Sequence, residues 1–287
     1  MEICVISPPL KNHLERFYVP ELTIAQFFGL QFSIGVLAGL AAIAWSAVQR
    51  PTPSRRIGAW LDVALAALVS GLIAARVVYV LMDWDYFRYF PEDWLDVWYG
   101  GVEWHSGIIG GLVGAWGMAR LQKVSFAAFS DGLALALPLG IMGGWWACRH
   151  AGCGCGRAVN PQANVPTWLT GHLIDLAGDV TLRYETQVLG VGATLMVLIG
   201  VTWLTVHEKW AGYRLWGVLF CIGLTTFWLG FLAGNPSDKI WGIRTGQILD
   251  ITLMIVSVLG LWLYRRFSRH GAKATVLNPA GNAEQPT

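Results

Sequence analysis

Residues 187–206 read QVLGVGATLMVLIGVTWLTV, a run of apolar and small residues without one charged side chain. A transmembrane α-helix needs about 20 consecutive, mostly apolar residues to cross the hydrocarbon core of a bilayer. The run has that length, so it predicts a helix that spans a membrane.

Further runs of the same kind are spread over the rest of the chain. They cover residues 23–48, 59–82, 103–121, 128–148, 215–234 and 248–264. The run at 103–121 is short and rich in glycine, and small residues at helical spacing suit close packing of helices in lipid. The sequence therefore predicts an all-α integral membrane protein with about seven transmembrane helices and a long extracytoplasmic loop region.

The composition excludes an ordinary soluble domain. Of the 287 residues, 55% are hydrophobic and 13% are charged, whereas soluble domains carry about 25% charged residues. The 16 tryptophans fit a membrane protein, since Trp favours the membrane–water interface. The net charge of +2 is too small to indicate a nucleic-acid partner.

Basic side chains are unevenly divided between the two sets of loops. One set of short loops and the tail holds Arg50, Arg55, Arg56, Arg120, Lys123, Lys209, Arg214, Arg265, Arg266, Arg269 and Lys273. The other set, longer and richer in acids, holds Lys11, Arg16, Arg88, Arg149, Arg157, Arg183, Lys239 and Arg244. Because cytoplasmic loops carry the excess of Lys and Arg, we expect the N-terminus outside and the C-terminus in the cytoplasm.

One membrane domain is expected over residues 1–270, followed by a disordered cytoplasmic tail over residues 271–287, which lacks apolar periodicity. On the outer side, the loop at 149–186 is unusually long, and loops longer than about 15 residues are usually functional. We expect a short helix near residues 168–178 within it.

Three cysteines and a histidine lie close together where the fourth run ends: Cys148, His150, Cys153 and Cys155. Three chemistries are open to them. They could hold a soft metal such as zinc or copper(I), or form a disulfide on an oxidising face of the membrane. Alternatively, one thiolate could be activated by neighbouring Arg149, His150 and Arg157.

A second candidate is His105, in the segment GGVEWHSG at residues 100–107. A histidine beside Glu103 at a membrane boundary is a candidate general base. The alternative is an interfacial histidine that satisfies a helix cap.

Ionisable and polar residues also occur inside or at the ends of the predicted spans. Arg76 and Asp131 lie within spans, where such residues usually face a cavity or a partner, although a purely structural ion pair is the alternative. Arg183, just before the fifth span, could bind a phosphate or carboxylate with two hydrogen bonds, or serve as an interfacial anchor. Asp250 opens the last span, where the helix dipole favours an acid.

Five segments, in this order, resemble those of the prolipoprotein diacylglyceryl transferase family. AARVVYVL, with Arg76 and Tyr79, resembles G-G-R-x-x-Y-V-L, and GGVEWHSG resembles GG-x-(S/x)-F-H-G-G, with His105 at its histidine. Ser130-Asp131 resembles an S-D pair, Arg183 and Gln187 resemble R-H-P-(S/T)-Q, and Gly246-Gln247-Ile248-Leu249 resembles G-Q-x-L-S. The resemblance runs through nearly the whole chain.

The resemblance implies seven membrane helices with the N-terminus outside, in the bacterial plasma (inner) membrane. It also implies a transferase of lipoprotein biosynthesis. Such an enzyme attaches the diacylglyceryl group of phosphatidylglycerol to the lipobox cysteine thiol of a secreted preprotein, and glycerol phosphate leaves. No cofactor is implied.

Several positions depart from the family pattern. The family's G-R-x-G-N-F-x-N-G-E falls on residues 144–153, where Trp145 replaces the arginine and Cys153 replaces the glutamate. Trp228 stands near the position of a second family arginine. The other departures are Cys148 and Ala151 for asparagines, Ser106 for a glycine, Phe28 for a tyrosine and Asp250 for a serine. Two phosphate-binding cations are therefore missing from their usual places.

The resemblance and the residues together assign candidate site residues. The catalytic candidates are His105 as the base, Arg183 and Cys153, and the substrate-binding candidates are Arg76, Tyr79, Arg149, Arg157, Gln187 and Gln247. In this assignment Arg183, with Arg149 or Arg157, holds the lipid phosphate. The alternatives on the same fold are a different thiol- or metal-dependent enzyme acting at a lipid site, and a non-catalytic membrane subunit.

Overall fold

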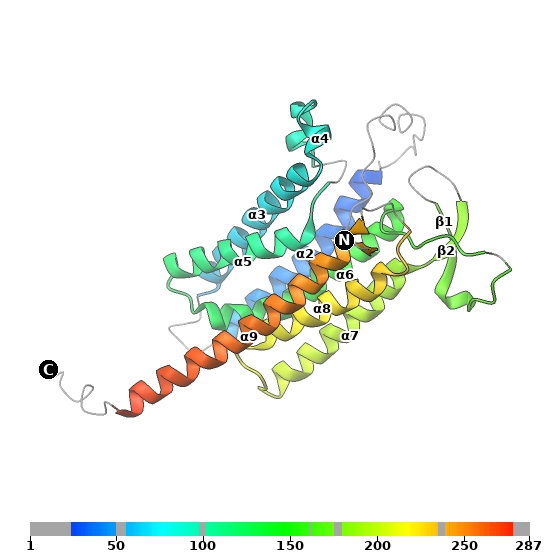
Figure 1. The fold of residues 1–287 in the computed structure, drawn as a ribbon. Helices are drawn as coiled ribbons and strands as arrows, with labels where there is room; N and C mark the ends of the chain where they lie inside the picture. The colour runs from blue at the N-terminus through cyan, green and yellow to red at the C-terminus, as the bar shows by residue number, and fades with distance from the viewer. Residues whose placement is uncertain are drawn as a thin grey trace.

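The computed structural model describes residues 24–49, 56–97, 101–160, 162–174, 180–234, 239–240 and 242–277. Its helices lie side by side along roughly one direction (Figure 1), with a β-hairpin at one end of the bundle and the last helix extending from the other.

Each predicted apolar run is a helix in the structure. The long helices are α2 (Ile24–Val48), α3 (Ile57–Met82), α5 (Trp104–Leu121), α6 (Phe126–Ala151), α7 (Thr186–Val206), α8 (Arg214–Gly230) and α9 (Thr245–Leu277). The short elements are α4 (Trp84–Phe87), the 3-10 helices η2 (Pro91–Leu95) and η3 (Thr167–Leu169), and the strands β1 (Thr170–Ile174), β2 (Val180–Tyr184), β3 (Lys239–Ile240) and β4 (Ile243–Arg244).

Five helices in the described part of the chain are long and apolar enough to cross a membrane. They are Phe28–Val48, Ile57–Met82, Phe126–Ala151, Thr186–Val206 and Thr245–Leu263. The apolar helix α8 is shorter, with 17 residues, and the glycine-rich α5 has 18 residues. The structure thus confirms an all-helical, multi-pass membrane architecture.

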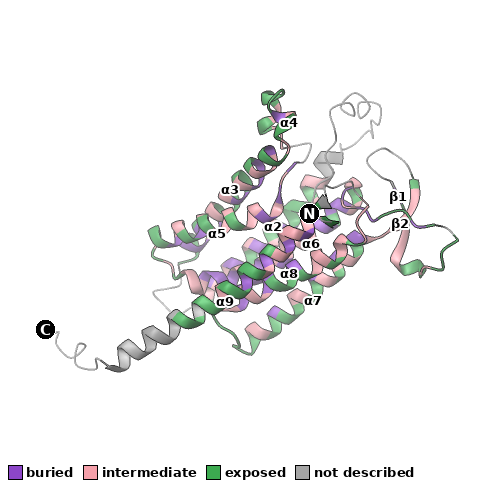
Figure 2. Cartoon of the chain, in the orientation of Figure 1, coloured by how far each residue is buried: buried purple, intermediate pink, exposed green. Residues whose placement is uncertain are grey.

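The outward faces of these helices are apolar and exposed, as lipid contact requires. Leu72, Ile73 and Val77 of α3 are each more than half exposed, and Figure 2 shows exposed residues along the outer sides of several helices. Water would disfavour such a surface, whereas lipid does not.

Small residues let α3 and α5 pack closely, as predicted for the glycine-rich run. A Cβ added at Gly110 would collide with Ala74 of α3, and one at Gly114 would collide with Ser70. Close approach of two helices through small residues is a common source of helix association in lipid.

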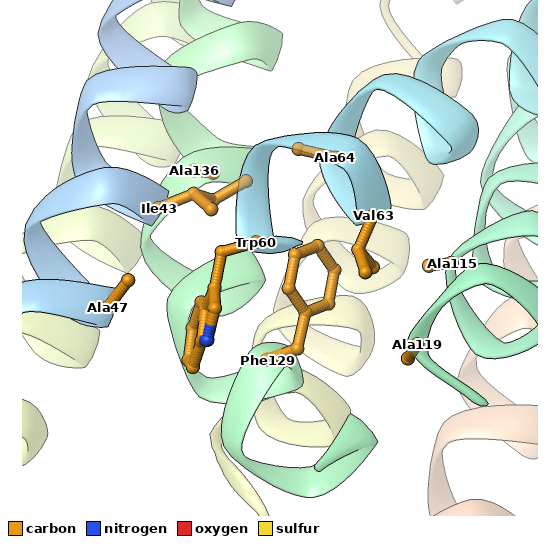
Figure 3. Close-up of a cluster of buried hydrophobic side chains, with 9 residues drawn as sticks. All are labelled: Ile43, Ala47, Trp60, Val63, Ala64, Ala115, Ala119, Phe129 and Ala136. Carbon is orange, nitrogen blue, oxygen red and sulfur yellow. The ribbon is translucent and has the colours of Figure 1, made fainter. Parts of the chain in front are cut away.

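At the end of the bundle near the loop between α5 and α6, an apolar core joins four helices. The Trp60 and Phe129 rings lie 5.7 Å apart (Figure 3). The residues around them are Ile43, Ala47, Val63, Ala64, Ala115, Ala119 and Ala136. At this end Asp131 accepts hydrogen bonds from the Gly212 N–H, at 2.9 Å to each oxygen, and lies 3.6 Å from the Arg214 guanidinium. The Asp131 carboxylate therefore holds the turn between α7 and α8.

The segment between α6 and α7 contains a hairpin, and α9 is longer than the last predicted run. The helix expected near 168–178 is wrong: β1 and β2 form an antiparallel hairpin in which Thr170 pairs with Tyr184 and Ile174 with Val180. The β-branched and aromatic residues of β2, such as Val180 and Tyr184, favour a strand. Helix α9 continues to Leu277, into the expected tail, and residues 278–287 lie outside the described residues.

Candidate functional site

Glu103 ends the loop before α5 and caps that helix. Its Oε1 accepts the backbone N–H of His105 at 2.9 Å, and its Oε2 accepts that of Ser106 at 2.7 Å. Its own N–H donates to the Ala75 carbonyl of α3 at 3.0 Å. A carboxylate at a helix N-terminus satisfies N–H groups that otherwise lack partners, so the capping role considered for His105 belongs to Glu103.

The His105 imidazole lies between two carboxylates inside the bundle. Its Nδ1 is 2.6 Å from Glu103 Oε1, and its Nε2 is 3.0 Å from Asp250 Oδ1 on α9. All three side chains are less than a tenth exposed. Thr226 Oγ1 of α8 is 2.5 Å from the same Asp250 oxygen. We call Glu103, His105, Thr226 and Asp250 the histidine cluster.

Helix periodicity places Asp250 on the same buried face of α9 as Gln247. Gln247 and Asp250 are one turn apart on α9, and both are buried, as residues three apart share a helix face. Gln247 Nε2 donates to the Phe227 carbonyl of α8 at 3.2 Å, and its Oε1 accepts the Arg244 N–H at 3.3 Å. The structure therefore places Gln247, a predicted substrate contact, at the junction of α8 and α9.

Arg76 of α3 binds the loop that precedes α5. Its guanidinium donates to the backbone carbonyls of Asp93 at 2.5 Å, Trp94 at 2.8 Å and Gly101 at 2.6 Å. Gly101 has φ +80°, and a Cβ there would lie 2.5 Å from Arg76 Nη1, so a glycine is needed at this position. Arg76 also lies 5.6 Å from the centre of the Tyr79 ring. These two predicted substrate contacts thus lie where α3 meets the loop that precedes α5.

The same loop contains a hydrogen bond between Tyr86 and Asp93. The phenol donates to Asp93 Oδ2 at 2.5 Å. Burial, this hydrogen bond and nearby acidic groups raise the pKa of Tyr86 to about 12. The phenol therefore remains a donor at neutral pH.

The cysteines lie where α6 ends. The helix stops at Gly152, whose φ of +73° is left-handed, and the Cys153 N–H returns to the Cys148 carbonyl at 3.0 Å. Of the three predicted chemistries, the structure has the disulfide, which joins Cys148 to Cys153. Cys155 is buried two residues further on. His150 is exposed, and its Nδ1 lies 3.1 Å from the Trp146 carbonyl of its own helix.

The start of α7 holds this cysteine loop, residues 152–156. Gln187 Nε2 donates to the Cys153 carbonyl at 3.0 Å, and Thr186 Oγ1 donates to the Gly154 carbonyl at 2.6 Å. Trp145 packs against Gly190, one turn along α7. Trp145 Nε1 and Gln187 Oε1 are buried without a hydrogen-bond partner in the described structure, and such groups are uncommon in proteins unless water or a ligand satisfies them.

The three arginines predicted to bind phosphate surround the cysteine loop. Arg149 Nη2 and Nε pair with the Glu185 carboxylate at 3.0 and 3.2 Å. Arg183 Nε donates to Thr181 Oγ1 at 2.8 Å. Arg157 is exposed and lies 5.6 Å from the centre of the Tyr184 ring. The cationic groups therefore gather at the base of the β1–β2 hairpin.

The residues after the C-terminal end of α8 link the cysteine loop to the start of α9. The Gly234 N–H donates to the Cys155 carbonyl at 3.0 Å. Arg244 Nη1, just before α9, donates to the Ala233 carbonyl at 3.3 Å. The predicted site residues thus form neighbouring groups: the arginines with the cysteine loop, the histidine cluster, and Arg76 with Tyr79. Trp228, which stands near a family arginine position, is 63% exposed on α8.

Sequence reasoning did not assign roles to Asp250, Thr226 and Glu185. A usable signal for Asp250 was its spacing of three residues from Gln247, which places both on one helix face. Nothing in the sequence indicated that Thr226 of α8 would meet Asp250, because that contact depends on helix packing.

Comparison with known proteins adds three findings. A family model described as prolipoprotein diacylglyceryl transferase matches residues 16–263. The phosphatidylglycerol–prolipoprotein diacylglyceryl transferase of Geobacillus kaustophilus is 27% identical over 247 residues, covering 84% of this chain and 88% of that protein. The proteins of the same name from Trichormus variabilis and Listeria monocytogenes are 28% and 26% identical, covering 84% and 72% of this chain and 86% and 74% of their own lengths.

Proposed function

We propose a reaction for this chain on the basis of its family: the chain belongs to the prolipoprotein diacylglyceryl transferase family. It is a membrane transferase that moves the diacylglyceryl group of phosphatidylglycerol to the cysteine thiol of a prolipoprotein. The acceptor is the lipobox cysteine of a secreted preprotein. The observation that carries the proposal is a buried acid–base group, His105 with two carboxylates, in a chain that matches the family from residue 16 to residue 263.

The proposed topology has seven crossings, with α5 and α8 crossing beside the five longer helices. The N-terminus is outside, the C-terminus is cytoplasmic, and residues 1–270 form one membrane domain. This arrangement puts the cysteine loop and the histidine cluster on the outer half of the bundle. Close packing of α5 against α3 supports a position for α5 within the bilayer.

The reaction requires a base, a clamp for phosphate and access for lipid. The S–H bond of the acceptor breaks and its proton goes to His105, which is proposed as the general base. The sulfur then attacks the glyceryl carbon, and the bond from that carbon to the phosphate oxygen breaks. Glycerol phosphate leaves with the electron pair and finally receives the proton.

The phosphate clamp is proposed to consist of Arg183 with Arg149 or Arg157, while Gln187 lines the site. Arg157 is exposed, so an arriving anion can reach its guanidinium. Arg149 is paired with Glu185, and an arriving phosphate must compete with that carboxylate. Trp145 contributes an indole N–H where the family pattern has a guanidinium.

Complementation tests this function. We expect the chain to restore lipidation of a reporter preprotein in bacteria depleted of their own transferase. His105→Gln should lower lipidation about 100-fold or more, because a general base contributes at least that factor. His150→Gln is the matched control, since His150 is exposed on α6, and it should lipidate normally.

A well-expressed wild-type chain that leaves the reporter unmodified would contradict the proposal. That result would favour the second candidate, a thiol-dependent enzyme on the same fold. The Cys148–Cys153 disulfide and Trp145 at the arginine position are the observations that support this alternative.

A further inference from the structure

The histidine cluster contains more hydrogen-bonding contacts than a neutral imidazole can serve. Both ring nitrogens of His105 face carboxylate oxygens, at 2.6 Å and 3.0 Å. A neutral imidazole has one N–H, and an ionised carboxylate only accepts hydrogen bonds. The two contacts therefore require two protons shared among Glu103, His105 and Asp250.

The first proton lies between His105 and Glu103. The two Glu103 oxygens already accept the backbone N–H groups of His105 and Ser106, which stabilises the carboxylate as an anion. The Nδ1 proton of His105 therefore points to Glu103. The second proton lies between His105 Nε2 and Asp250 Oδ1.

The Thr226 hydroxyl can form a hydrogen bond with Asp250 whether or not the second proton lies on that carboxylate. Its hydroxyl lies 2.5 Å from Asp250 Oδ1 and 2.9 Å from the Ile222 carbonyl. It can donate to Asp250 when that carboxylate is charged. When Asp250 is protonated, Thr226 can donate to Ile222 and accept from Asp250 instead.

The charged groups that face this imidazole come from two elements. Glu103 lies at the start of α5 and Asp250 on α9, whereas α8 contributes the neutral Thr226. From α3, the Ala75 carbonyl bonds the Glu103 N–H, and the Arg76 guanidinium bonds the carbonyl of Gly101. Each ring nitrogen of His105 therefore meets a carboxylate from a different element.

We propose that Asp250 is a positioning residue for the transfer reaction, because it takes over the Nε2 proton of His105 and so frees the base. The Nε2–H bond breaks, an O–H bond forms at Asp250 Oδ1, and that hydrogen turns to Thr226. The Nε2 electron pair then takes the proton of the acceptor thiol. After transfer, Nε2 gives this proton to the departing phosphate oxygen, and Asp250 returns its own. The inference rests on the proposed function.

The test measures pH dependence of transfer by Asp250→Asn in lipid nanodiscs. The amide cannot take a proton, so kcat should fall about tenfold or more while the KM for phosphatidylglycerol stays unchanged. The pH profile of transfer should change as well, because the variant side chain no longer accepts the Nε2 proton of His105. Asp250→Glu should recover part of the rate.

Asp131→Asn is the matched control, because Asp131 is an equally buried carboxylate that bonds Gly212 and Arg214 instead. It should leave the pH profile in place. Should Asp250→Asn not accumulate in the membrane, Asp250→Ser makes the same test. An unchanged profile in either Asp250 variant overturns the proposal.

A second measurement does not depend on activity. In nitrogen-15 spectra of histidine-labelled protein, the His105 signals are identified from their loss in His105→Gln. The Nε2 signal of His105 should differ between the wild type and Asp250→Asn, because the amide replaces the carboxylate that Nε2 contacts. Identical Nε2 signals overturn the inference about Asp250. If the Nε2 signals differ as expected but the wild-type protein shows no transfer, only the proposed function is refuted.

Discussion

At the scale of single residues, Arg76 binds the loop that precedes α5. It donates to three backbone carbonyls of that loop, which itself leads into Glu103. Its burial within α3 made it a functional candidate, with a structural role as the alternative, and no sequence pattern distinguishes the two. The partners are backbone carbonyls whose positions follow from the path of the loop, so side-chain identity could not reveal them.

Arg76→Met should lower the free energy of unfolding by about 2–3 kcal/mol, because it removes charged hydrogen bonds and leaves carbonyls without donors. Thermal unfolding in detergent measures this loss. Arg88→Met is the control: Arg88 pairs with Asp85 at 3.1 Å on the same loop but is well exposed, so its loss should cost less than about 0.5 kcal/mol. Equal losses in the two variants would refute the role assigned to Arg76.

At the scale of elements, the Cys148–Cys153 disulfide closes a short loop where α6 ends. Opening the disulfide by Cys148→Ser or Cys153→Ser should lower stability by about 2 kcal/mol, the chain-entropy value for so short a loop. Cys221→Ser on α8 is the control, since Cys221 is exposed and outside the disulfide. Thermal unfolding of all three variants without reductant makes the comparison. Unchanged melting of the Cys148 and Cys153 variants would contradict the assigned role.

Helices were the most predictable elements and the hairpin the least. A membrane-spanning helix satisfies its own backbone hydrogen bonds, so apolar length alone indicates where it lies. The β1–β2 hairpin depends on pairing between residues such as Thr170 and Tyr184, which are distant in sequence. The histidine cluster has the same limitation: Glu103 and His105 are two residues apart in the sequence, but Asp250 meets His105 only through the packing of α9.

At the scale of the whole molecule, α5 and α8 decide the number of crossings. Alkaline phosphatase, which is active only outside the cytoplasm, should be active when fused after Asp96 or Asn160 and inactive after Gln122 or Glu208. A green fluorescent protein fused at Thr287 should fluoresce. These outcomes follow from seven crossings with the N-terminus outside.

Activity after both Asp96 and Gln122 would show that α5 does not cross. The bundle would then have fewer crossings than proposed, and the distribution of Lys and Arg would need another explanation. The cysteine loop and the histidine cluster could then lie on different sides of the membrane.

The central claim is that this chain transfers a diacylglyceryl group to a lipobox cysteine. The most direct measurement is the mass of the reporter's cysteine peptide from depleted bacteria that express the chain. With wild-type protein we expect the peptide mass to increase by one diacylglyceryl group on the cysteine sulfur, and with His105→Gln we expect no increase. An unmodified cysteine in cells with abundant wild-type protein in the membrane would contradict it.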